Sequence, residues 1–118
     1  MLPKQFRLKK RSAFNATYRS GKSLYQNGIT VFCGKEKKNN SPTKIGFVVS
    51  KRIHKRAVKR NRIKRLMRES MRLYIKKSEN FDTKYMSLIF VATSKLLDKN
   101  FADINYGIDK IMSKINNA

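Results

Sequence analysis

The chain has 118 residues, 40% of them apolar, and a formal net charge of +22. This length and apolar content suit one domain with a packed core, and so large a positive charge favours a polyanionic partner over an ordinary solvated surface. A single cysteine, Cys33, excludes an internal disulfide and a cysteine-rich metal site. The sequence shows neither a signal-peptide pattern nor an apolar run long enough to span a membrane, so we expect a cytoplasmic domain over residues 1–118.

The N-terminal part is predicted to be a short helix preceded by an irregular basic segment, residues 1–11. Ser12 is a plausible N-cap, and the helix should run to about Arg19. Gly21 then suits the position just beyond the helix, where a left-handed backbone is common. Residues 22–26 follow as a short candidate strand.

Two further strands are predicted on either side of a polar turn. Residues 29–36 alternate in hydrophobicity, with Ile29, Val31 and Cys33 on one face, and residues 44–50 contain the apolar run IGFVV. The intervening residues 37–43 are rich in turn formers. This pattern predicts that the two strands pair as a hairpin.

The rest of the chain alternates helix, strand and helix. A long basic helix should begin within residues 54–58 and end near Lys77, and the apolar run 86–93 should be a central strand covered on both faces. A last helix is expected over residues 102–116, with a core stripe of Ile104, Ile108, Ile111, Met112 and Ile115. The order αβββαβα predicts an α+β fold, a single-domain sandwich of helices against one sheet.

Positive charge is concentrated in the first two-thirds of the chain. Residues 1–72 carry 22 bases and 2 acids, a net charge of +20, whereas residues 73–118 carry 7 bases and 5 acids, a net charge of +2. All ten arginines lie in the first part. Because the guanidinium group binds phosphate through two parallel hydrogen bonds, we expect the binding surface there.

The long basic helix combines an apolar stripe with a cationic surface. Its stripe fits one helical face and consists of Ile63, Leu66, Met67, Ser70, Met71 and Tyr74. Upstream of Ile63 the same side carries Arg56, Lys59 and Arg60, which cannot be buried unpaired. The first two turns must therefore project past the edge of the core or lie along an open groove. Asn61 could bond either the backbone or a nucleotide.

Two aromatic residues share a face of the short first helix. Phe14 and Tyr18 are four positions apart, next to Lys10, and Phe32 lies opposite the apolar face of its strand. Aromatic rings among bases suit stacking on unpaired nucleotides. Packing in the core is the alternative, and periodicity alone favours it.

Catalytic patterns are not evident in the sequence. It contains no Ser-His-Asp, Cys-His or paired-carboxylate arrangement and no glycine-rich phosphate loop, and its few acids are scattered. His54, the only histidine, lies in a basic run and suits a role in the turn into the helix. We therefore expect a chain that binds and does not cut. A ribosomal or other structural RNA-binding protein is the alternative.

The sequence resembles the protein subunit of bacterial ribonuclease P. The signature segment of that family is matched by Ser50-Lys51-Arg52, Arg60-Asn61-Arg62-Ile63-Lys64-Arg65-Leu66 and Arg68-Glu69, and its N-terminal region by Arg7-Leu8, Phe14, Tyr18 and Arg19-Ser20-Gly21. The resemblance implies a mixed sheet with a left-handed βαβ crossover, against the usual right-handed rule. It also implies an accessory subunit of an endoribonuclease.

The resemblance further implies partners and site residues. Family members assemble with a catalytic RNA, which uses Mg²⁺ to remove the 5′ leader from precursor tRNA, so we expect no catalytic residue, metal or cofactor on the protein itself. Neither a membrane nor an obligate protein partner is expected. Contacts to the RNA subunit are assigned to Lys51, Arg52, Arg56, Lys59, Arg60, Asn61, Arg62, Lys64, Arg65 and Arg68. Contacts to the leader are assigned to Lys10, Phe14, Tyr18 and Phe32.

Overall fold

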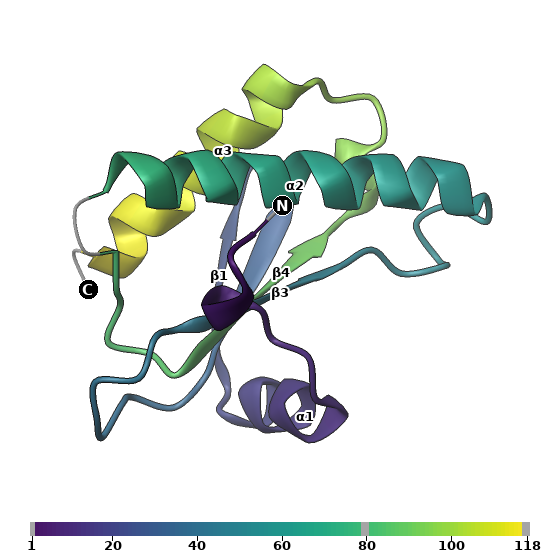
Figure 1. Ribbon diagram of the computed structural model, residues 1–118. Helices are drawn as coiled ribbons and strands as arrows, with labels where there is room; N and C mark the ends of the chain where they lie inside the picture. Colours follow the sequence, from purple (N-terminus) through teal and green to yellow (C-terminus); the bar gives the residue numbers. More distant parts are fainter. Residues whose placement is uncertain (1, 79–80, 117–118) are drawn as a thin grey trace.

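The fold is built on one mixed sheet of four strands, seen in a computed structural model that describes residues 2–78 and 81–116 (Figure 1). The spatial order is β1-β2-β4-β3, in which β3 runs parallel to β4 and the other neighbours are antiparallel. The strands are β1 (Lys22–Gln26), β2 (Ile29–Cys33), β3 (Lys44–Val48) and β4 (Ser87–Ala92). The helices are α1 (Arg11–Arg19), α2 (Ala57–Lys77) and α3 (Phe101–Asn116), with 3₁₀ turns at Lys4–Phe6 and Ser94–Leu96.

Helices cover the two faces of the sheet unequally. Figure 1 shows α2 and α3 crossing each other on one side of the sheet, with α1 on the opposite side. Along β2, Ile29, Val31 and Cys33 are buried under α2 and α3, whereas Thr30 and Phe32 point to the α1 side and are only half-buried. The short helix α1 therefore leaves part of its face of the sheet open.

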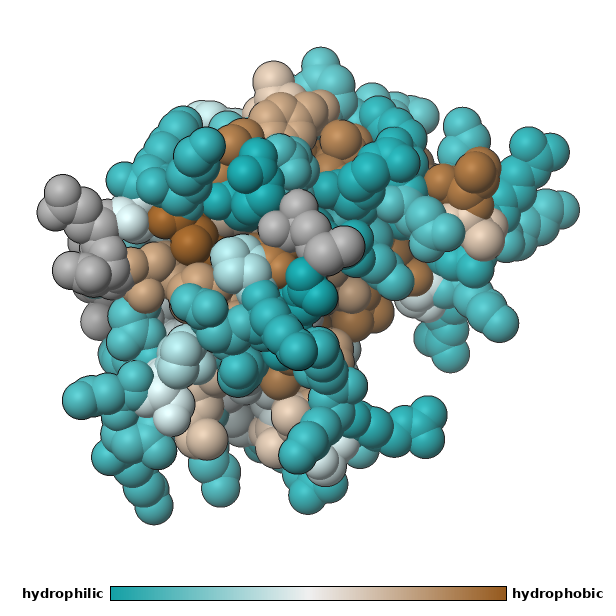
Figure 2. All heavy atoms as spheres, viewed as in Figure 1, coloured by the Kyte–Doolittle hydropathy of each residue, from teal (hydrophilic) through white to brown (hydrophobic). Residues whose placement is uncertain are grey.

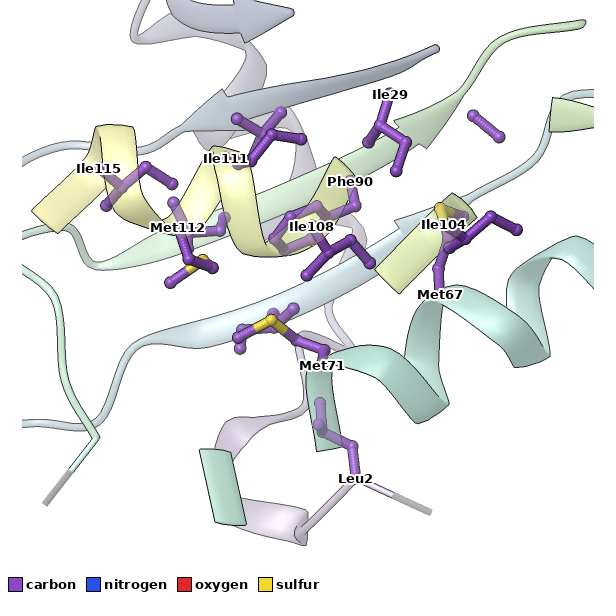
Figure 3. Packing of buried hydrophobic residues seen from close by; sticks show 14 of the residues in the cluster. Leu2, Ile29, Met67, Met71, Phe90, Ile104, Ile108, Ile111, Met112 and Ile115 are labelled. Carbon is purple, nitrogen blue, oxygen red and sulfur yellow. The ribbon is translucent and has the colours of Figure 1, made fainter. Parts of the chain in front are cut away.

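The main core lies between the sheet and the helix pair α2 and α3 (Figure 3). Met67 and Met71 of α2 are fully buried there with Phe90 of β4. Every member of the stripe predicted for α3 is also buried, namely Ile104, Ile108, Ile111, Met112 and Ile115. The predicted stripes of both long helices and the central position of β4 are thus confirmed.

The predicted hairpin between the second and third strands is wrong. β2 pairs with β1 and β4, and β3 pairs with β4 alone, so β4 lies between them. The physical reason is that β4 is apolar on both faces and is best buried with a neighbour on each edge. The connection formed by residues 34–43 is long enough for the chain to pass β4 and form β3 on its other edge.

Of the two predictions made for the ends of α1, one is confirmed and one is wrong. Gly21 adopts a φ of +79° just after α1, as expected. Ser12 is not the N-cap, because α1 begins at Arg11 and Lys10 occupies the cap position without a side-chain hydrogen bond. The reason lies in the preceding chain: the Leu8 N–H donates to the Ile45 carbonyl, so residues 7–8 run along the open edge of β3 and the helix starts immediately beyond.

Candidate nucleic-acid interface

The start of α2, before Ile63, projects beyond the core, as the charge pattern predicted. No residue of this helix before Ile63 is buried, and Val58 is 71% exposed. Figure 1 shows this end of α2 extending past the sheet, and Figure 2 shows hydrophilic side chains standing out from the body around it. The geometry presents these bases to a partner instead of to the protein interior.

The positive charge on α2 is almost uncompensated within the chain. Its one acid, Glu69, accepts two hydrogen bonds from Arg72, of 3.0 Å and 2.6 Å, which lower the pKa of Glu69 and raise that of Arg72. Within residues 2–78 and 81–116, none of the bases assigned to the RNA subunit forms an ion pair with a carboxylate. The helix therefore carries a strong field that an external polyanion would neutralise.

Two of the signature arginines also hold the structure around α2. Arg60 Nη1 donates to the carbonyls of His54 and Lys55, at 2.9 Å and 2.8 Å, and Arg62 Nη2 donates to the carbonyl of Lys99 at 3.1 Å. A guanidinium has five N–H donors, so both groups keep donors for phosphate. Sequence patterns gave no sign of this second role.

The loop that leads into α2 is ordered by its own polar groups. Ser50 Oγ accepts from the Arg52 N–H at 3.1 Å, and His54 Nδ1 accepts from the Arg56 N–H at 3.0 Å. Lys51, Arg52 and Arg56 are exposed around this turn. The suggested role of His54 in the turn into the helix agrees with this contact.

Three aromatic side chains form a cluster on the α1 side of the sheet, and none of them belongs to the main core. Tyr18 is 38% exposed and meets Phe32 edge-to-face, with 5.0 Å between the ring centroids. Phe14 is half-buried beside β3. Partial burial raises the pKa of the Tyr18 phenol. We call Phe14, Tyr18 and Phe32 the aromatic cluster.

A buried hydroxyl pair fixes α1 on the sheet beneath this cluster. Thr17 Oγ1 donates to the Ala13 carbonyl at 2.8 Å, so its oxygen accepts the hydrogen bond from Ser87 Oγ of β4 at 2.5 Å. Both side chains are buried, with exposures of 1% and 9%. This anchor sets the height of Phe14 and Tyr18 above the strands.

A hollow of about 320 Å³ joins the aromatic cluster to α2 across the edge of β3. Its walls include Phe14 of α1, Gly46 and Phe47 of β3, and Lys64 and Arg68 of α2. The structure thus brings together members of the two predicted residue sets from helices on opposite faces of the sheet. Tyr18 and Phe32 lie outside this hollow, and Lys10 lines a neighbouring one.

Sequence reasoning missed two further bases at this place. Arg7 and Lys9 line the same hollow, because the N-terminal segment runs along β3. Their side chains belong to a segment predicted as irregular, so no periodicity could have placed them. Asn61 is exposed on α2, next to Arg60 and Arg62.

Other chemistries find little support in the described part of the chain. Within residues 2–78 and 81–116, no group of three or more His, Cys, Asp or Glu side chains is arranged to hold a metal ion. The same residues include no helix that is both long and apolar enough to cross a bilayer.

Replacing Gly46 by alanine should displace Phe14. A Cβ at this position would lie 2.7 Å from Phe14 Cε1 and Cζ, closer than van der Waals contact allows, so the ring must move away from β3. We expect a loss of about 1–3 kcal/mol in the free energy of unfolding, measured by chemical denaturation. Shortening Phe14 to leucine should remove most of that loss in the double variant. Equal losses from Gly46→Ala with either residue at position 14 would contradict this packing.

Comparison with known proteins agrees with this geometry. The family model for ribonuclease P matches residues 2–116. The ribonuclease P protein component of Clostridium kluyveri is 35% identical over 112 residues, covering 92% of this chain and 93% of that protein. The component from Fusobacterium nucleatum is 36% identical over 110 residues, covering 92% and 91%.

A solved structure extends the agreement to the fold. The Staphylococcus aureus RNase P protein, solved at 2.0 Å, superposes with a TM-score of 0.78 at 25% identity, covering 96% of this chain and 99% of that one. A connection of the opposite hand would not superpose, so the β3–α2–β4 crossover has the hand of that fold and the expected fold class is confirmed. The chain belongs to the ribonuclease P protein family.

Proposed function

We propose that this chain binds the catalytic RNA of ribonuclease P through α2 and the 5′ leader of precursor tRNA through the aromatic cluster. The observation that carries the proposal is the hollow at the edge of β3, where Phe14 lies together with Lys64 and Arg68. One continuous surface then meets both RNAs. The whole chain acts as one RNA-binding domain, and no membrane or further protein is needed.

Binding to the RNA subunit rests on the unpaired bases of α2 and its preceding loop. Arginine forks dock on phosphate through parallel hydrogen bonds, and each neutralised phosphate releases condensed counterions. Asn61 lies among these bases and offers both a donor and an acceptor. The bases assigned to this contact act mainly on backbone phosphate, so they set affinity and position more than sequence preference.

Binding to the leader rests on ring stacking. Single-stranded RNA exposes its bases, and aromatic side chains stack on any of them. Tyr18 is exposed beside Phe32, and Lys10 is exposed just before α1, where it can meet a phosphate. The leader then lies on the part of the sheet that α1 leaves uncovered.

We assign the chemical step to the RNA subunit, where bound Mg²⁺ would activate water and stabilise the leaving oxygen. The side chains of this chain are poor candidates for that step. Cys33 is buried, and burial is the main cause that raises the pKa of its thiol, against smaller opposite effects of Lys22 and Lys84. His54 Nδ1 is occupied by the Arg56 N–H.

Replacing Arg60 and Arg62 together by alanine should weaken binding to the RNA subunit. The slope of log affinity against log salt should shrink by about one per lost phosphate contact. Thermal stability should fall only slightly, because the three hydrogen bonds from these guanidinium groups are at least partly exposed. Filter binding across a salt series, with circular dichroism, measures both effects.

A matched control is available at the other end of the same helix. Lys76→Ala with Lys77→Ala removes the same amount of charge from exposed positions of α2 that we assign to no contact. We expect this control to change the salt slope much less. Equal slopes for the two double variants would mean that only total charge matters and that the assigned α2 contact is wrong.

Replacing Tyr18 by alanine should weaken binding of precursor tRNA by about 1–3 kcal/mol, the cost of losing one stacked base. Mature tRNA has no leader and should bind the assembled enzyme as before. Because Tyr18 is partly exposed and lies outside the main core, its loss should cost little stability. The quantity to measure is the ratio of precursor to mature affinity, together with the melting temperature.

Phe14→Ala and Tyr18→Phe provide the internal comparison. Phe14→Ala should lower the same ratio but also lower the melting temperature, because this ring packs against Gly46. Tyr18→Phe keeps a ring at the edge of Phe32 and should preserve the ratio. An unchanged ratio in both alanine variants would show that the cluster is structural, and the leader site would then be misplaced.

A further inference from the structure

A second hollow has aromatic and basic walls, and none of its lining residues has been assigned to an RNA contact above. Of the assigned residues, Arg62 reaches it, through the hydrogen bond to the Lys99 carbonyl. The hollow has a volume of about 360 Å³ and lies between the β1–β2 turn and the segment that leads into α3. Tyr25 of β1 and Tyr106 of α3 both line it. They are 49% and 54% exposed, which makes them, with Met86 and Val58, the most exposed large apolar side chains of the described residues.

Lysines accompany both rings. Lys95 Nζ lies 5.6 Å from the centroid of Tyr25, and Lys110 Nζ lies 5.3 Å from that of Tyr106. Lys95 and Lys99 line the hollow, and within the described ranges neither forms an ion pair with a carboxylate. Three of the seven lysines in residues 73–118 therefore gather at one place.

The one acid of this hollow already has a structural role. Asp103 exchanges hydrogen bonds with Asn100 at the start of α3: its N–H donates to Asn100 Oδ1 at 3.0 Å, and its carboxylate accepts from the Asn100 N–H at 3.5 Å. This reciprocal arrangement caps the helix. With Lys95 and Lys99 against this single carboxylate, the lining of the hollow carries a net positive charge.

The two tyrosines line the same hollow because α3 approaches the β1–β2 turn closely. Gly107 makes this possible, since a Cβ there would lie 3.3 Å from Asn27 Cβ and would press against the turn. Asn27 and Gly28 form that turn with φ values of 51° and 86°. Tyr106, next to Gly107 in α3, is thereby placed beside the strand that carries Tyr25.

Tyr25, one wall of the second hollow, lies on the same side of the sheet as Phe32 of the aromatic cluster. Tyr25 is the cross-strand partner of Thr30, so the two side chains point to the same side of the sheet, the α1 side. Phe32 lies two residues further along β2, about 7 Å from Thr30, and points to that side as well. On its other border, the bond from Arg62 to the Lys99 carbonyl ties the hollow to α2. A strand of RNA lying on the cluster would reach this hollow without leaving the protein surface.

We propose that this hollow binds leader nucleotides farther from the cleavage site than those at the aromatic cluster, by stacking on Tyr25 and Tyr106 and pairing phosphate with Lys95 and Lys99. The inference rests on the proposed function, because it extends the same leader path. Aromatic rings interleaved with lysines are the usual means of binding single-stranded RNA without sequence preference. Long leaders then gain affinity from this protein that short leaders do not.

The test compares two precursor tRNAs in the reconstituted enzyme, one with a leader of about four nucleotides and one with about twelve, within the range of known single-strand site sizes. Tyr25→Ala with Tyr106→Ala should weaken binding of the long-leader precursor by about five- to tenfold. The short-leader precursor and mature tRNA should bind unchanged. Tyr25→Phe with Tyr106→Phe keeps the rings and should restore long-leader binding.

Several outcomes would overturn the proposal. Equal losses for long, short and mature RNAs would assign the hollow to the RNA subunit, and no loss at all would mean that the tyrosines are only surface residues. If the tyrosine variant folds poorly, Lys95→Ala with Lys99→Ala tests the same point. It should weaken binding of the long-leader precursor and leave binding of the short-leader precursor unchanged. Tyr18→Ala in the same assay should weaken both precursors, so failure of the proposed function is visible separately from failure at this hollow.

Discussion

Phe90→Ala is expected to lower the free energy of unfolding by about 3–5 kcal/mol, a large part of the stability of a chain of this size. Phe90 is fully buried in the central strand and stacks on Phe47 of β3, with 5.6 Å between centroids and 18° between ring planes. Its removal leaves a cavity under α2 and α3 that the surrounding methionines cannot fill without losing their own contacts. Urea denaturation followed by circular dichroism measures the change.

Tyr106→Ala is the matched control for this variant. It also removes an aromatic ring, but from a position that is 54% exposed, so its effect should stay within about 0.5 kcal/mol. RNA binding by Phe90→Ala should recover when the temperature is lowered enough to refold the protein, because Phe90 touches no RNA. A loss below about 1 kcal/mol for Phe90→Ala would contradict the position of the core.

The elements of the fold were largely predictable from local patterns. The apolar stripes of α2 and α3 predicted which side of each helix is buried. The continuous apolar run of β4 predicted that this strand is buried on both faces. The pairing of β3 with β4 was not predictable in the same way. An alternating pattern fixes which face of a strand is buried and says nothing about its neighbour in the sheet.

The candidate site was predictable in composition but not in arrangement. Dense arginine before the apolar stripe correctly placed the first turns of α2 outside the core. The spacing of Phe14 and Tyr18 is the same whether their face meets the core or an open part of the sheet, so periodicity could not decide between them. Only the three-dimensional packing shows that α1 lies on the opposite side of the sheet from α2 and α3.

Contacts between distant segments were beyond the reach of the sequence. Three features join parts far apart in the chain: the bond from Arg62 to Lys99, the approach of α3 to the β1–β2 turn, and the hollow that Phe14 lines together with Lys64 and Arg68. Such contacts depend on tertiary packing and leave no local periodicity. They are also the features from which the two leader-binding surfaces were inferred.

Cleavage of precursor tRNA by the cognate RNA subunit, measured with and without this protein across a Mg²⁺ series, tests the central claim most directly. A net charge of +22 can replace counterions between two polyanions, so the protein should accelerate cleavage most at low Mg²⁺ and little at high Mg²⁺. RNA-free protein should cleave nothing at any Mg²⁺ concentration. Specific 5′ maturation by the protein alone, or equal rates with and without it at low Mg²⁺, would contradict the account.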